Sequence, residues 1–181
     1  MENSSNNDVQ QVWINAWQSP GADRLMGEIY AALRKGLPID AYLRQLPPPF
    51  PLSNCLNGVP FRNLDFSQYD LREISFDYAD LSGSNFTKAF LAESSFIGTQ
   101  LVNTQFSGAF LEGLMFGTAE LTGADSSNAQ LKNAHFGLAN LEGVNFSGAD
   151  LNGAIFLRAR NVNLANFDGC DLSEVRFLQL T

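Results

Sequence analysis

The sequence predicts a solenoid, and three regularities between residues 61 and 177 support that prediction. Phe or Leu occupies 19 of the 20 positions found at five-residue intervals from 61 to 156. The residue two positions before these is small at 14 of the 20, and Gly or Asn commonly stands two positions after. A fixed repeat of this length is typical of a solenoid, in which each unit buries its apolar group against its neighbours.

The repeat also predicts the cross-section. A period of five matches neither an α-helix, at 3.6 residues per turn, nor a strand, at two. One large and one small inward residue per five-residue side describe a narrow, packed tube, as Ala79 and Leu81 illustrate. Gly83 then stands where the chain turns a corner, because glycine tolerates positive φ.

Segments such as Ala79-Asp80-Leu81-Ser82-Gly83 and Ala149-Asp150-Leu151-Asn152-Gly153 resemble the A(D/N)LXX motif of the pentapeptide-repeat family. The resemblance covers about two-thirds of the chain. It implies an all-β solenoid, a right-handed β-helix of square cross-section with four pentapeptides per turn. About six four-sided turns then form a rod roughly 29 Å long, at about 4.8 Å per stacked strand.

Two irregularities interrupt the repeat. Ser126 takes the place of a central Phe, which predicts either a local cavity or a hydroxyl bonded to the backbone, or simple drift in a redundant repeat. After Phe156 the frame slips by one residue, so a small bulge carrying Arg158 and Arg160 is expected, either structural or a contact loop. The inward series is then expected to continue as Val162, Phe167, Leu172 and Phe177.

The chain divides into a helical extension at 1–46, a Pro-rich linker at 47–58 and the repeat at 59–181. Three short helices are expected in the extension. Because a solenoid end exposes strand edges and core, the helices are expected to cap its first turn. The alternative is a helical module that binds a partner. The expected cap residues are Trp13, Trp17, Leu25, Ile29 and Leu33.

Charge excludes one class of function. The net charge is −8, of which residues 61–181 carry −7, from 14 acids and seven bases. Non-specific nucleic-acid binding needs clustered Lys and Arg, so direct nucleic-acid binding is not expected. The acidity is explained either by solubility or by a basic partner.

The cysteines and the N-terminus bear on the compartment. Cys55 lies in the linker and Cys170 at a small inward position, which argues against a disulfide framework and favours a reducing compartment. Neither a signal peptide nor a membrane span is recognisable, so a cytoplasmic location is expected.

The sequence predicts no catalytic chemistry, cofactor or metal. His135 is the single histidine, so a catalytic triad or a His-rich metal site is not expected. Asp70, Asp150 and Asp171 share one outward column, but Phe90, Phe110 and Gln130 separate them. An acid–base pair or calcium site is therefore not expected, and the chain is predicted to be non-enzymatic.

The sharpest functional signal is a pair of aromatic residues out of register. Phe90 and Phe110 each directly precede an inward Leu, so both are expected to point outward, one above the other on adjacent turns. Aligned exposed apolar side chains mark a protein interface, or else they strengthen the ladder. The full predicted protein-binding patch is Phe90, Phe110, Ile97, Met115, Ile155 and Leu157.

The last turn is expected to lack a covering helix. An uncovered solenoid end associates readily. We therefore expect an end-to-end homodimer through Phe177, Leu178 and Leu180.

Together these features predict a protein-binding scaffold, an acidic rod that presents an exposed apolar patch to an unidentified protein partner. The family resemblance also implies that many related proteins in cyanobacteria are rods of this kind. The alternative is a DNA mimic that modulates gyrase or another topoisomerase, as in quinolone-resistance members of the family. The −7 charge favours this alternative. The lack of a C-terminal dimerisation helix and of long loops, and the arginines of the expected bulge, speak against it.

Overall fold

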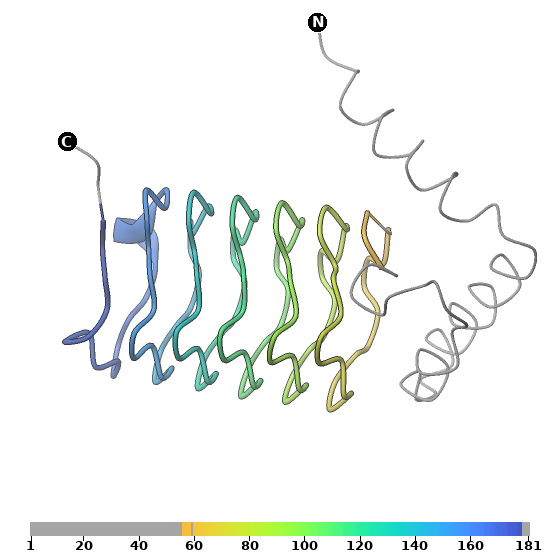
Figure 1. Cartoon of the computed structure of the whole chain (residues 1–181), viewed down its shortest axis with the longest axis horizontal. Helices are drawn as coiled ribbons and strands as arrows, with labels where there is room; N and C mark the ends of the chain where they lie inside the picture. The colour runs from red at the N-terminus through yellow and green to blue at the C-terminus, as the bar shows by residue number, and fades with distance from the viewer. Residues whose placement is uncertain (1–55, 59, 179–181) are drawn as a thin grey trace, which may run out of the picture.

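The computed structural model describes residues 56–58 and 60–178. The predicted helices and cap residues of 1–46, linker residues 47–55 and Leu180 lie outside the described residues. Within the described part the chain coils into a rod, with each coil beside the next (Figure 1). The single helical element of the described residues is the 3-10 helix η2, Val162–Leu164. The β-structure of these residues consists of isolated parallel β-bridges between neighbouring coils.

The bridges give the period of the coil. Pro60 pairs with Asp80, Asp65 with Asn85, and each later bridge up to residue 160 also joins residues 20 apart. Four five-residue sides therefore make one turn, as the motif implied. A β-helix solenoid is thus confirmed, whereas its handedness and the total of about six turns stay predictions.

Each side is short because a corner follows every strand residue. At one corner the amide of Ala89 donates to the carbonyl of Phe86 at 3.0 Å, and Lys88 between them has φ 57°. Beyond the corner the amide of Leu91 donates to the carbonyl of Phe110 on the next coil, at 2.9 Å. The corner and the ladder together satisfy the backbone groups that the narrow tube would otherwise bury.

The core follows the predicted five-residue period. Leu91 and Phe96 are both completely buried. The ring of Phe96 stacks on that of Phe76 at 4.9 Å and meets those of Phe86 and Phe106 edge-on at 5.9 and 6.0 Å. Columns of stacked rings therefore run along the rod and contact each other across it, an arrangement that aromatic quadrupoles favour.

Polar residues at the small inward positions bond to the backbone. The hydroxyls of Ser84 and Ser94 donate to carbonyls 23 residues earlier, each at 2.7 Å, and Thr99 does the same at 2.9 Å. Cys170 sits at an equivalent position, with its Sγ 2.9 Å from the carbonyl oxygen of Phe146. Each of these four polar groups thereby has a partner, which removes the penalty for burying it.

Ser126 keeps the backbone in register but interrupts a ring column. Its amide donates to the carbonyl of Asn145 at 2.8 Å, as at any regular rung. The side chain is buried, and in the described part of the chain its hydroxyl makes no hydrogen bond. The predicted hydroxyl-to-backbone bond is therefore wrong.

The predicted bulge is wrong in one respect. Arg158 is an ordinary corner residue with φ 52°, and Arg160 still bridges Asn140. The extra residue is accommodated immediately afterwards, by Asn161 in a left-handed conformation and by η2, after which Asn145 pairs with Asn166 across 21 residues. The arginines stay in frame because their carbonyl and amide groups still complete the ladder.

Two expected inward residues of the last coil also differ. Val162 lies in η2 and is only half-buried, and Leu172 is exposed. Phe167 still stacks on Phe146 at 5.2 Å, and Phe177 on Phe156 at 5.1 Å. Leu172 is exposed because no described coil lies beyond it.

Candidate functional surfaces

The pair of outward phenylalanines lies on one side of the rod. Phe90 and Phe110 are bridged to each other, and their rings are nearly parallel, 5° apart, with centroids at 4.6 Å. Phe90 is 42% exposed and Phe110 is half-buried. We call these two residues the Phe pair, and its predicted outward orientation agrees with the geometry.

Exposed Lys88 lies at the corner before the Phe pair, and carboxylates lie on the other flank of the pair. Glu73, Glu93 and Glu112 stand at the corner that follows it, all exposed, and none of the three forms an ion pair within the described residues. Arg72 is held by Asp70 through two hydrogen bonds of 2.7 and 2.8 Å. That hydrogen bonding and charge raise the pKa of Arg72. The field on the flank that carries these glutamates is therefore negative, beside an apolar platform.

The rest of the predicted patch lies beyond that corner. Met115 and Ile155 occupy the strand column of the next side, and Ile97 and Leu157 the corner after it. The corner with Glu93 and Glu112 separates these residues from the Phe pair. The Phe pair and the other four residues thus lie on adjoining sides of the coil, with this corner between them.

Sequence reasoning missed two residues that belong with those four. Tyr78 is 58% exposed and Leu138 is 47% exposed, at the same corner as Ile97 and Leu157. Both have positive φ, 60° and 61°, a conformation that bulky residues adopt at a cost. The sequence signal for these two residues was a bulky side chain at a corner position where Gly or Asn is usual. The apolar corner comprises Tyr78, Ile97, Met115, Leu138, Ile155 and Leu157.

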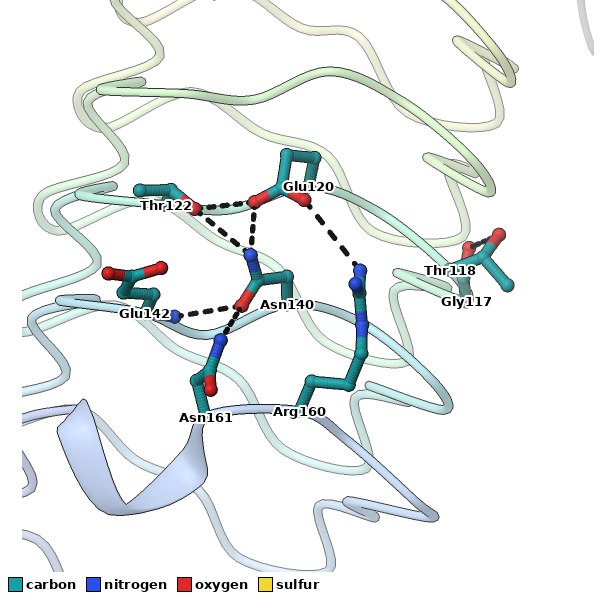
Figure 2. Close-up of polar contacts among 8 residues, drawn as sticks. All are labelled: Gly117, Thr118, Glu120, Thr122, Asn140, Glu142, Arg160 and Asn161. Carbon is teal, nitrogen blue, oxygen red and sulfur yellow. Dashed lines mark hydrogen bonds and ion pairs between the residues drawn. The ribbon is translucent and has the colours of Figure 1, made fainter. Parts of the chain in front are cut away.

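A polar network lies beside the insertion (Figure 2). The side-chain amide nitrogen of Asn140 donates to Glu120 at 2.6 Å and to Thr122 at 3.2 Å, and its oxygen accepts from Asn161 at 2.7 Å. Arg160 lies 3.6 Å from the other oxygen of Glu120. Since Asn140 has partners for both donor and acceptor, the network holds the inserted residue in place and leaves Asn140 without a hydrogen-bonding group for a ligand.

The C-terminal end is apolar, as predicted. Phe177 and Leu178 are both exposed, while Leu180 lies outside the described residues. No described residue covers the outer face of this coil.

Chemically reactive groups are dispersed. His135 is half-buried in a strand column, bridged to Met115 and Ile155. In residues 56–58 and 60–178, no three His, Cys, Asp or Glu side chains are grouped closely enough to hold a metal ion. Over the same residues no helix is long and apolar enough to span a membrane.

These features define a β-helix solenoid built from five-residue sides. Residues 69–146 match the family model described as a pentapeptide repeat region. Residues 69–146 therefore form a pentapeptide repeat region. No curated protein sequence matches the chain significantly.

Several solved structures are similar. Rfr23, a pentapeptide repeat protein from the cyanobacterium Cyanothece 51142, has a TM-score of 0.52 at 20% identity, over 69% of this chain and 91% of its own. QnrB1, a plasmid-mediated fluoroquinolone resistance protein, has a TM-score of 0.40 at 25% identity, over 71% of this chain and 79% of its own. A pentapeptide repeat protein from the Arabidopsis thaliana thylakoid lumen has a TM-score of 0.35 at 26% identity, with 74% of each chain covered. The likeness to Rfr23 supports the fold.

Proposed function

We propose that this protein is a non-enzymatic scaffold that binds a protein partner through the Phe pair. The observation that carries the proposal is the stack of Phe90 on Phe110, with ring centroids at 4.6 Å, beside three carboxylates that form no ion pair within the described residues. The core needs neither ring, because the inward Phe and Leu columns fill the tube without them. Exposed aromatic side chains of this kind are typical anchors of protein interfaces.

The chemistry of the platform indicates the chemistry of the partner. An apolar or guanidinium side chain fits the face of an aromatic ring. Glu73, Glu93 and Glu112 add long-range attraction for a basic segment and repel an acidic one. A partner segment that combines Arg or Lys with an apolar anchor meets both requirements.

The proposed test compares partner capture by the wild type and by Phe90→Ser/Phe110→Ser. Both substitutions lie outside the core, so far-ultraviolet circular dichroism and the melting temperature are expected to stay close to wild type. Partners retained by the wild type are expected to be lost with the double variant. The matched control is Gln100→Ser/Gln105→Ser, which changes two outward strand residues on other sides.

A second arm tests the charge. Glu93→Gln/Glu112→Gln is expected to weaken capture and to flatten its dependence on salt. An unchanged set of captured proteins with the Phe variant would contradict the proposal and leave the rings as a surface ladder.

The remaining predicted architecture completes the proposal. A right-handed coil of about six turns is expected to carry the helical extension 1–46 as a cap on its first turn. The exposed Phe177 and Leu178 support the predicted end-to-end contact. Phe177→Ser/Leu178→Ser is expected to remove any homodimer formed at that end, as measured by light scattering.

The alternative, a DNA mimic acting on gyrase or another topoisomerase, has one observation in its favour, the net −7 of residues 61–181. Against it, the outward column Asp80, Gln100, Glu120, Asn140 and Arg160 alternates acids with neutral residues and ends in a cation. A phosphate mimic needs a more continuous series of negative charges. A gyrase supercoiling assay with and without a quinolone discriminates between the two functions.

A further inference from the structure

One edge of the rod concentrates most of the large apolar side chains that are exposed between residues 60 and 160. Between residues 60 and 160 the large apolar side chains exposed to solvent are Tyr78, Phe90, Met115, Leu138 and Leu157. All but Phe90 belong to the apolar corner, and half-buried Ile97 and Ile155 extend it. A single apolar edge on a rod that is otherwise polar and charged indicates a contact surface.

Two glycines leave room within this edge. Gly117 and Gly137 stand in the column of Ile97 and Leu157, and neither has the positive φ that would require glycine. A Cβ at Gly117 would meet nothing closer than Ile97 at 3.8 Å, and one at Gly137 nothing closer than the carbonyl oxygen of Leu157 at 3.9 Å. This stretch of the column therefore has a large side chain at Ile97 and at Leu157, and open space at the two glycines between them.

The charges on the edge are separated by sign. Asp77 lies at its N-terminal end and accepts hydrogen bonds from Ser95 and from the amide of Ile97, but it pairs with no cation in the described part of the chain. Arg158 and Arg176 lie at the C-terminal end, and within the described residues neither has an ion-pair partner. The edge is thus negative at one end and positive at the other.

We propose that the apolar corner binds the apolar corner of a second copy of this chain, with the two rods side by side and antiparallel. A two-fold axis in the interface, perpendicular to the rods, lays each column on itself in reverse order. With the axis at the rung of Gly117, Ile97 of each copy faces the space at Gly137 of the other. Large side chains then meet small ones, as packing requires.

The same axis pairs the charges. Four rungs separate Asp77 from Leu157, so Asp77 of one copy lies opposite the Leu157–Arg158 step of the other. Tyr78 likewise lies opposite Arg158, a ring-to-guanidinium contact. A parallel arrangement would instead place Arg158 against Arg158, and charge repulsion disfavours it. This inference does not depend on the Phe pair, which lies on the preceding side of the rod.

The interface is short. Four rungs at about 4.8 Å span roughly 19 Å, which puts the contact in the weak, transient class. We therefore expect association at high micromolar concentrations and a monomer in dilute solution.

Sedimentation equilibrium of the full chain tests the proposal. The weight-average mass is expected to rise with concentration from 19.8 kDa towards twice that value. Gly137→Gln fills the space opposite Ile97 without straining its own coil, and is expected to weaken association at least about tenfold. Ser147→Gln, at the equivalent position of another corner, is the matched control and is expected to associate like wild type. Arg158→Glu is expected to weaken association as well.

Cross-linking identifies the geometry. Thr118 is exposed and lies on the axis rung, so two copies of Thr118→Cys in a Cys55→Ser/Cys170→Ser background face each other. Under mild oxidation this variant is expected to form a disulfide-linked dimer, and adding Gly137→Gln is expected to suppress it. A strict monomer at all concentrations overturns the proposal, as does a dimer that persists in Gly137→Gln. The end-to-end contact proposed above uses a different surface, so Phe177→Ser/Leu178→Ser is expected to leave the Thr118→Cys cross-link unchanged, and loss of that cross-link in Phe177→Ser/Leu178→Ser overturns the side-by-side proposal too.

Discussion

Ser126→Phe is expected to stabilise the protein, because the rod retains the frame for a ring that the sequence omits. In the same column Phe86 stacks on Phe106 at 5.2 Å, and Phe146 stacks on Phe167 at 5.2 Å, on either side of the interruption. The Ser126 amide bonds to the next coil at 2.8 Å, and the amide of Ala129 bonds back to Ser126 at 3.2 Å. The backbone has therefore not closed over the missing side chain.

The magnitude follows from the neighbouring column. Removing a buried Phe typically lowers the free energy of unfolding by about 3–5 kcal/mol. Adding a ring to a space that had stayed fully open would raise it by the same amount. Phe116 has partly relaxed, since its ring is tilted by 33° from that of Phe96 at 5.8 Å, whereas Phe116 and Phe136 stack at 4.9 Å with 7° between them. Part of the space is thus already used, and we expect a gain of about 2–3 kcal/mol.

Urea denaturation and thermal melting measure this gain. A gain of this size raises the melting temperature by roughly 6–12 °C for a domain of this length. Phe106→Ser is the converse control and should destabilise by about 3–5 kcal/mol. Ser127→Phe, whose side chain points outward and which loses a hydroxyl contact with Ser107, should change stability by less than about 1 kcal/mol. A lower midpoint for Ser126→Phe would show that the core has closed around the serine and would refute the reasoning.

Two further predictions concern ionisation. Burial opposes ionisation of Asp80, but hydrogen bonds from Ser82 and Arg62 outweigh it and lower the Asp80 pKa, so its stabilising effect is present above about pH 4 and is lost as the pH falls through the lowered value. Asp80→Asn should therefore reduce the urea midpoint at pH 7 but not at pH 2, and an equal loss at both would contradict the assignment. Burial raises the pKa of the Cys170 thiol. In Cys55→Ser, the Cys170 thiol should react with a disulfide reagent more slowly in the folded protein at pH 8 than in the urea-unfolded protein at the same pH. Equal rates would show that folding does not protect this thiol.

The repeat itself could be predicted from the sequence because it is local and redundant. Each five-residue side carries its own inward pair and its own corner residue, as Ala109, Leu111 and Gly113 show, so the inward direction of Leu91 or Phe96 needs no knowledge of distant contacts. The outward direction of Phe90 followed from the same frame. Those predictions agree with the structure because every unit repeats the same physical solution.

Other features depended on contacts between coils. The position of the insertion was decided when Asn161 took a left-handed conformation and donated its side-chain amide to Asn140, 21 residues earlier, which kept Arg158 and Arg160 in frame. The grouping of Tyr78 and Leu138 into one apolar edge likewise appeared only when residues 20 apart were stacked. Composition and period determine what each side of the coil buries. Which outward side chains become neighbours is decided by the length of one turn and by where the extra residue is absorbed, because surface contacts join residues of different coils.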